Sequence, residues 1–125
     1  MLEKLQFYIN GQWVDPVEPR SLDVVNPATE DVYGRISLGS AADVDRAVTA
    51  ARRAFDSYSQ TSREERLDLL RAILAEFKNR HDDVAEAIMN EMGAPRGLAR
   101  GAQAMSGPQH IRCLLYTSPS PRDTF

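Results

Sequence analysis

The sequence predicts an α/β protein, with short strands in its first 40 residues and amphipathic helices after them. Residues 24–55 contain the pattern of a strand, a proline turn, a second strand, a Gly-Ser joint and a one-faced helix. From there to about Arg112, apolar residues recur at spacings of three and four, which is the period of a helix. A strand-rich part is therefore expected to precede a helical part.

A β-hairpin is expected close to the first residue. Phe7–Ile9 and Gln12–Val14 flank the pair Asn10-Gly11, and both residues of such a pair tolerate the positive φ of a type I′ turn. Trp13 is interpreted as packing bulk on this hairpin and not as a stacking platform for a ligand.

A second pair of strands is expected before the first helix. Pro27 pushes Asn26 towards an extended conformation, so Val24-Val25 is interpreted as the end of a strand that enters a turn. Val32 and Ile36 supply β-branched bulk for a return strand. The two strands together form a ribbon.

The first helix is expected to begin after Ser40, whose side chain can accept hydrogen bonds from free N–H groups of the first turn. Asp43 places a negative charge where the helix dipole favours it. The apolar residues of this helix fall on one stripe, which predicts docking through a single face: Val44, Ala47, Val48, Ala51 and Phe55.

Three more helices are expected after the first one. Ser62 and Glu65 form a capping box that opens the second helix. The third helix is expected to end at Gly93, because a glycine stop with Pro95 beyond it is typical of a helix terminus. A fourth helix is expected to start near Pro95.

Composition narrows the classes of function. The chain has 125 residues, 42% hydrophobic and 26% charged, with a net charge of −3. A basic patch for nucleic acid is therefore not expected. The chain contains no run of 18 apolar residues, so a membrane-spanning helix is not expected either. Because the first residues lack the apolar region of a secretory signal, the cytoplasm is the expected location.

No cluster of residues has the pattern of a catalytic site. Adjacent carboxylates such as Glu64-Glu65 point to different sides of a helix, and no G-x-G-x-x-G or Walker loop is present. His81 stands between two helices, where the dipole of the preceding helix favours a cation. Its use as a general base is the less favoured interpretation.

Three segments in order resemble the amino-terminal region of the NAD(P)-dependent aldehyde dehydrogenase superfamily. These segments are Ile9–Val14, the stretch from Asn-Pro-Ala-Thr to Phe55, and Glu91–Pro95, and the resemblance covers roughly residues 7–112. One departure is Glu30-Asp31, where the family commonly has Gly-Glu. If that position requires positive φ, the non-glycine residue costs on the order of 1 kcal/mol.

The resemblance implies an aldehyde dehydrogenase-like fold in which residues 1–112 are the amino-terminal part: a β-hairpin, a β-ribbon and amphipathic helices of the cofactor-binding domain. The intact parent would oxidise an aldehyde to a carboxylic acid with NAD or NADP through a cysteine thioester, as a homo-oligomer. The catalytic cysteine and general-base glutamate of the family lie in Gly-Gln-x-Cys and Glu-Leu-Gly-Gly-Lys contexts, neither of which occurs here. The chain itself is therefore expected to hold no catalytic or cofactor-binding residue and to be inactive.

Two alternatives stay open. The first is a small non-catalytic helical interaction module, in which every amphipathic face would be covered within the chain. The second is a part of a semialdehyde-specific or acylating aldehyde dehydrogenase, because such enzymes share the same motifs. The motifs present do not distinguish between aldehydes or between NAD and NADP.

Residues 113–125 differ in character from the rest of the chain. Cys113–Asp123 reads CLLYTSPSPRD, which resembles the translated read-through of a transposon-type sequencing adapter. With two prolines and no apolar period, this tail is expected to be unstructured and foreign to the gene. His110 and Cys113 are therefore not interpreted as a base and a nucleophile.

The resemblance also implies a metal site. Several members of the family hold a monovalent cation between backbone carbonyls before the Asn-Pro-Ala-Thr segment and an acidic residue before the Gly-x-Pro turn. The matching residues are Val24, Val25 and Glu91. Their oxygen atoms are hard ligands that suit such an ion.

Overall fold

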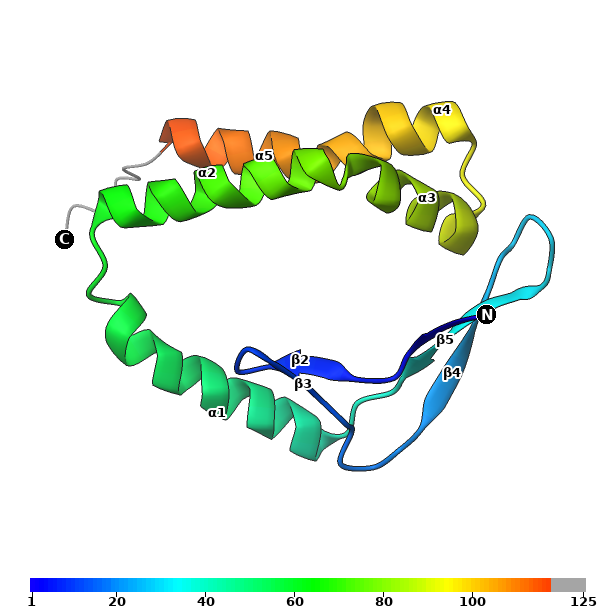
Figure 1. Ribbon diagram of the computed structural model, residues 1–125, viewed down its shortest axis with the longest axis horizontal. Coiled ribbons are helices and arrows are strands. Elements are labelled where there is room, and N and C mark those ends of the chain that lie inside the picture. Colours follow the sequence, from blue (N-terminus) through cyan, green and yellow to red (C-terminus); the bar gives the residue numbers. More distant parts are fainter. Residues whose placement is uncertain (118–125) are drawn as a thin grey trace. The chain divides into compact units, whose positions relative to one another are not determined.

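The computed structural model describes residues 1–117 and divides the chain into two compact units, Met1–Gln60 and Thr61–Phe125 (Figure 1). Strands and one long helix make up the first unit, and the second is helical. The predicted order of a strand-rich part before a helical part is confirmed. No helix among residues 1–117 is long and apolar enough to cross a membrane.

A three-stranded sheet forms one part of the first unit. Its strands β1 (Leu2–Lys4), β4 (Ser21–Val25) and β5 (Val32–Ser37) lie in the order β1-β5-β4. β4 and β5 pair antiparallel, as the predicted ribbon requires, and β1 pairs with β5 in parallel. The parallel strand was not predicted, because three residues carry too little alternation to indicate a strand.

The predicted hairpin is present as β2 (Phe7–Ile9) and β3 (Gln12–Val14). Asn10 and Gly11 in its turn have φ of 54° and 77°, as a type I′ turn requires. The rings of Tyr8 and Trp13 face each other across the two strands with centroids 5.2 Å apart. Trp13 thus makes a cross-strand ring contact on the hairpin while 63% of its surface stays exposed.

The turn between β4 and β5 places Glu30 in the left-handed region. The Asn26 side-chain oxygen accepts a hydrogen bond from the Ala28 N–H at 2.9 Å, and the Asn26 N–H donates to the Asp31 carbonyl at 2.9 Å. Between them Glu30 has φ of 62°. The position that departs from the family pattern is thus one that favours glycine.

We expect Glu30→Gly to raise the free energy of unfolding by up to about 1 kcal/mol, because glycine removes the steric cost of the left-handed conformation. Asp31→Gly is the matched control. Its φ is not positive, so this change should lower the stability by roughly 0.5–1 kcal/mol. Urea unfolding of both variants measures the difference, and equal effects would contradict the argument.

Helix α1 (Ala41–Tyr58) begins at Ser40 with a capping box that Ser40 and Asp43 share. The helix contacts β2. Three residues of its predicted apolar stripe, Val44, Val48 and Phe55, are exposed. The predicted helix is confirmed, but its predicted docking through this face is not seen, because no neighbour within the described residues buries the face.

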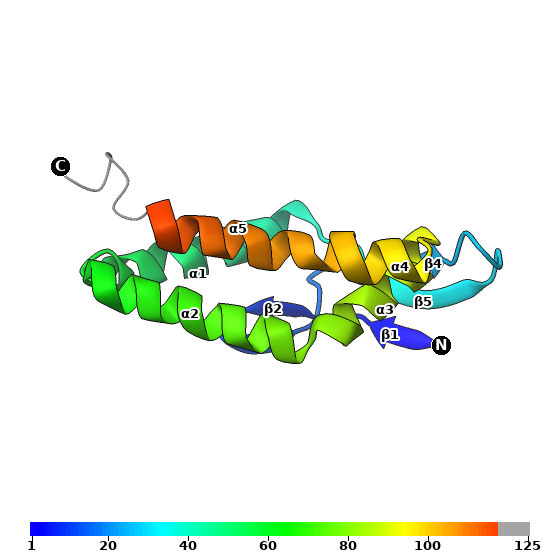
Figure 2. The same ribbon diagram turned by 90° about the horizontal axis from the view of Figure 1, so that it is seen from above.

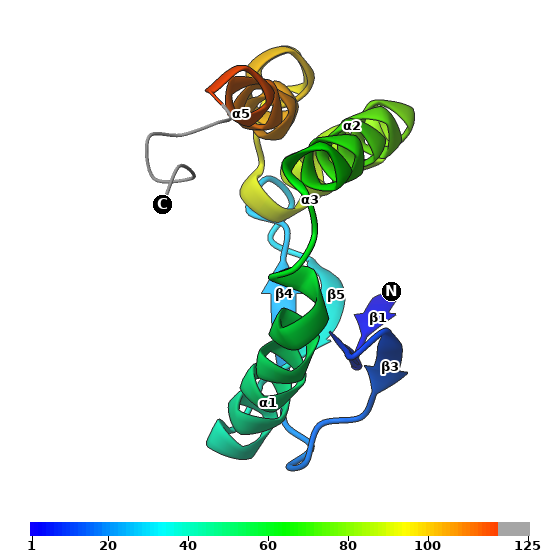
Figure 3. The ribbon, with the colours of Figure 1, turned by 90° about the vertical axis from the view of Figure 1, so that its left-hand side faces the viewer.

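The second unit is built from α2 (Arg63–Asn79), α3 (His81–Met92), α4 (Arg96–Leu98), the π-helical turn η1 (Ala99–Gln103) and α5 (Ala104–Thr117). The Ser62–Glu65 capping box and the stop at Gly93, with φ of 66°, are both as predicted. Figures 1 and 2 show α5 returning alongside α2, and Figure 3 looks nearly along both helices.

Small side chains hold the second unit together. Its buried residues are Leu67, Ala85, Ala99, Ala104 and Pro108. Alanine at three of these positions allows helix backbones to approach closely, so a change of a single methyl group alters the packing.

The fourth predicted helix is longer than expected. It passes through the π-helical turn and the buried Pro108, and it continues to Thr117. The expectation that irregular structure begins at Cys113 is therefore wrong for Cys113–Thr117. Leu115 is half-buried, and the Thr117 hydroxyl donates to the Cys113 carbonyl at 2.9 Å, so these residues extend the helix. The rest of the predicted unstructured tail, residues 118–125, lies outside the described residues.

Candidate functional site

The predicted cation ligands lie on two elements. Val24 and Val25 end β4 in the first unit, and the register with β5 shifts between them. A register shift of this kind disturbs the regular ladder, so a carbonyl there can turn away from its strand partner. Glu91 lies in the last turn of α3 in the second unit and is exposed. The cation site stays a prediction.

Cys113 and His110 both lie on α5 and are exposed. Among residues 1–117, no hydrogen bond or ion pair joins the two side chains. A nucleophilic thiolate requires a positive neighbour, a base or a helix N-terminus to lower its pKa. Among residues 1–117, the structure therefore does not pair Cys113 with His110 as a nucleophile and its base.

Each ring nitrogen of His81 lies close to an oxygen atom of another residue. Nε2 lies 3.0 Å from the carbonyl oxygen of Arg100, and Nδ1 lies 3.2 Å from a carboxylate oxygen of Asp82. Arg100 pairs with the same carboxylate at 2.9 Å. Both partners are acceptors, so a neutral imidazole donates to one of them at a time, and these contacts tie the start of α3 to the π-helical turn.

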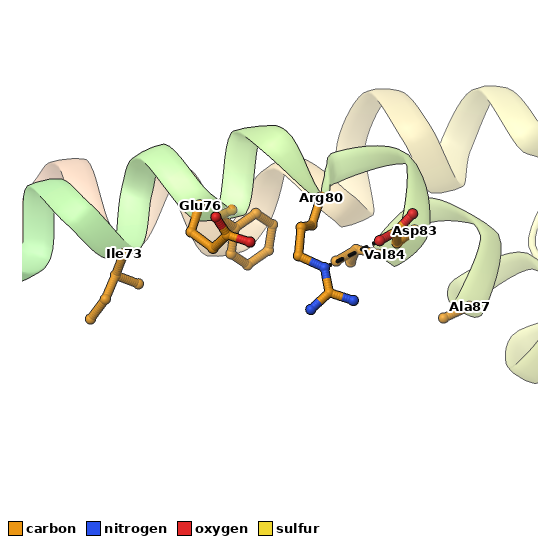
Figure 4. Close-up of a pocket in the computed structure, with 7 residues that line it drawn as sticks. Ile73, Glu76, Arg80, Asp83, Val84 and Ala87 are labelled. Carbon is orange, nitrogen blue, oxygen red and sulfur yellow. Dashed lines mark hydrogen bonds and ion pairs between the residues drawn. The ribbon is translucent and has the colours of Figure 1, made fainter. Parts of the chain in front are cut away.

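A groove runs along α2 and the start of α3 (Figure 4). Its volume is about 480 Å³, with Ile73, Phe77, Val84 and Ala87 as apolar lining and Glu76, Arg80 and Asp83 as polar lining. Arg80 Nε pairs with Asp83 Oδ2 at 3.2 Å. Neither cysteine nor histidine lines the groove, and among residues 1–117 no cluster of His, Cys, Asp and Glu could hold a metal ion. Its apolar lining offers surface for packing.

Asp43 is the buried charge of the first unit, with 4% of its surface exposed. One carboxylate oxygen accepts from the Val17 N–H at 3.0 Å, and the other accepts from the N–H and hydroxyl of Ser40 at 2.9 and 2.8 Å. Hydrogen bonds from the backbone of Ser40 and Val17 lower the pKa of Asp43 below its ordinary value. The contact with Val17 was not predicted, because it spans 26 residues.

We expect Asp43→Asn to destabilise the first unit, because it removes the charge that accepts two backbone N–H groups. A carboxyl group with a lowered pKa stabilises the fold above its unfolded pKa, about 3.9, and this contribution is lost as pH falls through the folded value. The variant should therefore melt at a lower temperature than the unmodified chain at pH 7 and show a smaller difference at pH 3.

The control for that measurement is Asp45→Asn, on the exposed side of the same helix. This change should leave both melting temperatures nearly unchanged, since an exposed carboxylate contributes little. A difference between Asp43→Asn and the unmodified chain that is equally large at pH 3 and pH 7 would show that the charge is not the cause.

Comparison with known proteins decides the family. The chain matches the aldehyde dehydrogenase family over residues 13–120. It belongs to this family. A 3-succinoylsemialdehyde-pyridine dehydrogenase of a Pseudomonas species is 50% identical over 112 residues, which cover 89% of this chain and 24% of that protein.

Solved aldehyde dehydrogenases share the conformation of the chain. The enzyme of Bartonella henselae has a TM-score of 0.91 and 44% identity over 94% of this chain and 25% of its own. Aldehyde dehydrogenase C of Pseudomonas syringae, solved with NAD+ and octanal, has a TM-score of 0.85 and 46% identity over 90% of this chain and 24% of its own. The predicted aldehyde dehydrogenase-like fold is confirmed, and the chain spans about a quarter of the length of these relatives.

Proposed function

We propose that this chain is part of a longer protein that oxidises an aldehyde to a carboxylic acid with NAD+ or NADP+ and that assembles as a homo-oligomer. The observation that supports this most strongly is the TM-score of 0.91 at 44% identity with the Bartonella henselae aldehyde dehydrogenase. The NAD+ and octanal of the Pseudomonas syringae structure support the cofactor and substrate class. The bound NAD+ or NADP+ would accept the hydride.

The proposed role of this chain is that of a scaffold. In the reaction that the family resemblance implies, a cysteine thiolate adds to the aldehyde carbonyl, hydride leaves the resulting carbon, and water hydrolyses the thioester. Cys113 is the only cysteine of the chain and is exposed. An activated thiolate, an oxyanion donor and a general base must therefore come from the rest of the longer protein.

The purified 125-residue chain tests this division of roles. We expect it neither to bind NAD+ or NADP+ in equilibrium dialysis nor to reduce either with aldehydes of several chain lengths, whereas the longer gene product should do both. Cys113→Ala should change nothing. Turnover by the isolated chain that survives Cys113→Ala would contradict the proposal.

One observation favours a narrower substrate class. The Pseudomonas relative with 50% identity is named for a semialdehyde, a substrate that carries a second functional group. We therefore propose such an aldehyde as the second candidate. The longer protein should then have a higher kcat/KM for a carboxylate-bearing semialdehyde than for the unsubstituted aldehyde of equal length, and equal values would contradict this.

A monovalent cation is a separate proposal. It is supported by the family resemblance at Val24, Val25 and Glu91 and by the hard oxygen ligands that these residues offer. In the longer protein, Glu91→Gln should weaken activation by potassium, while Glu86→Gln on the same helix should not. Equal activation by potassium and by a bulky organic cation would rule the site out.

A further inference from the structure

The turn of the β2–β3 hairpin exposes an asparagine that is followed by a glycine. Asn10 and Gly11 are both exposed, and a Cβ atom at Gly11 would meet no heavy atom within 4 Å. Asparagine is a chemically labile residue, and a glycine after it adds no side chain that could hinder an approach to its amide carbon. The turn therefore combines a labile amide with an unhindered backbone nitrogen and open access for water.

Such a pair can lose ammonia through a cyclic imide. The backbone nitrogen of Gly11 gives up its proton and bonds to Asn10 Cγ, and the bond from Cγ to Nδ2 breaks as ammonia leaves with that proton. Water then opens the resulting succinimide, at one carbonyl to give aspartate and at the other to give isoaspartate. No oxidant or reductant is required, and a neutral amide is replaced by a carboxylate.

The closed turn keeps the two reacting atoms apart. Asn10 has φ of 54°, and ψ at this position of a type I′ turn is about 30°. At this ψ the Gly11 nitrogen lies nearly opposite Asn10 Cβ across the Cα–C bond, so Cγ, which is attached to Cβ, cannot reach it. The reaction therefore requires a rotation about ψ of Asn10, and this rotation opens the hairpin.

The hairpin is suited to open in this way. β2 and β3 have three residues each and form a two-stranded sheet, and an isolated hairpin of two strands is marginally stable. Tyr8 and Trp13, whose rings meet across the strands, are 64% and 63% exposed. We propose that Asn10 is a site of deamidation and that opening of the β2–β3 hairpin controls the rate of this modification.

The isoaspartate product keeps the hairpin open. In this product the main chain runs through the former side chain of residue 10, so the turn gains a methylene group. The two-residue turn sets the pairing of Ile9 with Gln12, and the longer backbone no longer fits that turn. Deamidation thus makes a transient opening permanent. The reaction involves only the turn and water, so it is independent of the proposed aldehyde oxidation.

Incubation of the 125-residue chain at pH 8, followed by mass spectrometry of its peptides, measures the replacement of NH by oxygen at residue 10. Asn79 is the internal control. It is exposed as well, but it lies on α2, and the Arg80 N–H donates to the Glu76 carbonyl at 3.1 Å. We expect Asn10 to react about tenfold faster than Asn79 or more, because the helix holds the nitrogen that would attack Asn79. Unfolding in urea should raise the rate at Asn10 further.

Tyr8→Ala tests whether opening controls the rate. Loss of the cross-strand ring pair weakens the hairpin, so deamidation of Asn10 should become roughly 1.5- to fivefold faster. Tyr116→Ala, at an exposed tyrosine of α5, is the matched control and should leave the rate unchanged. A rate at Asn10 no higher than at Asn79 would overturn the proposed site. A rate at Asn10 that Tyr8→Ala or urea does not raise would overturn its control by the hairpin.

Discussion

Replacing Gly107 by alanine is expected to destabilise the second unit by about 1–3 kcal/mol, because the added methyl group overpacks the contact between α5 and α2. A Cβ atom at this position would lie 2.9 Å from two ring carbons of Phe77. The residue after it is the buried Pro108, and a side chain before proline is disfavoured in helical backbone. Glycine relieves both clashes.

Gly101→Ala is the control for this substitution. A Cβ atom at Gly101 meets no other heavy atom within 4 Å, so the change should leave the stability unchanged or raise it by up to about 1 kcal/mol through helix propensity. Urea unfolding of the two variants measures the difference. If Gly107→Ala proved as stable as Gly101→Ala, the close packing of α5 on α2 would be contradicted.

Replacing Gly34 by alanine is expected to separate β1 from β5, at a cost of about 1–3 kcal/mol. The added Cβ would lie 2.8 Å from the backbone oxygen of Leu2 and 3.3 Å from its Cβ. Leu2 is the residue that pairs with Gly34 in the parallel ladder. Because the first clash is with backbone, it can be relieved only if the strand moves.

Hydrogen exchange of the amides in Leu2–Lys4 measures this effect, and faster exchange is the expected result. Gly39→Ala is the control, since its Cβ would meet Phe7 Cζ at 3.7 Å, which is an ordinary contact. Unchanged exchange of β1 in Gly34→Ala would contradict the pairing of β1 with β5.

Local chemistry explains which elements the sequence could predict. The hairpin follows from Asn10-Gly11, the start of α2 from the Ser62 capping box, and the end of α3 from Gly93. Each signal lies within a few residues of the feature that it predicts. Strand β1 could not be predicted in this way, because its partner lies 32 positions away, at Gly34 for Leu2.

The last helix shows how packing overrides a local signal. Pro108 lacks an N–H and ordinarily ends or kinks a helix, yet α5 contains it and continues to Thr117. Pro108 is buried, and a π-helical turn, Ala99–Gln103, precedes the helix that continues past it. A π-helical turn has no reliable pattern in a single sequence and was not predicted.

The predicted cation site rests on family resemblance alone. The ligand positions Val24, Val25 and Glu91 came from matched motifs, and nothing in their local pattern indicates a cation site. The contact between Asp43 and Val17 is of another kind. The capping pattern at Ser40 predicts that the Asp43 carboxylate lies in the first turn of the helix, but it does not predict the long-range partner of that carboxylate. Long-range polar contacts of this kind require the fold.

Formation of NADH by a graft of residues 1–112 onto the remaining part of the Pseudomonas relative tests most directly whether this chain supplies scaffold and no chemistry. We predict aldehyde-dependent NADH formation by the graft, loss of that activity when the cysteine that the family resemblance places in a Gly-Gln-x-Cys context is changed to alanine in the relative's part, and none from the isolated chain. A folded graft without activity, or activity that survives loss of that cysteine, would contradict the account.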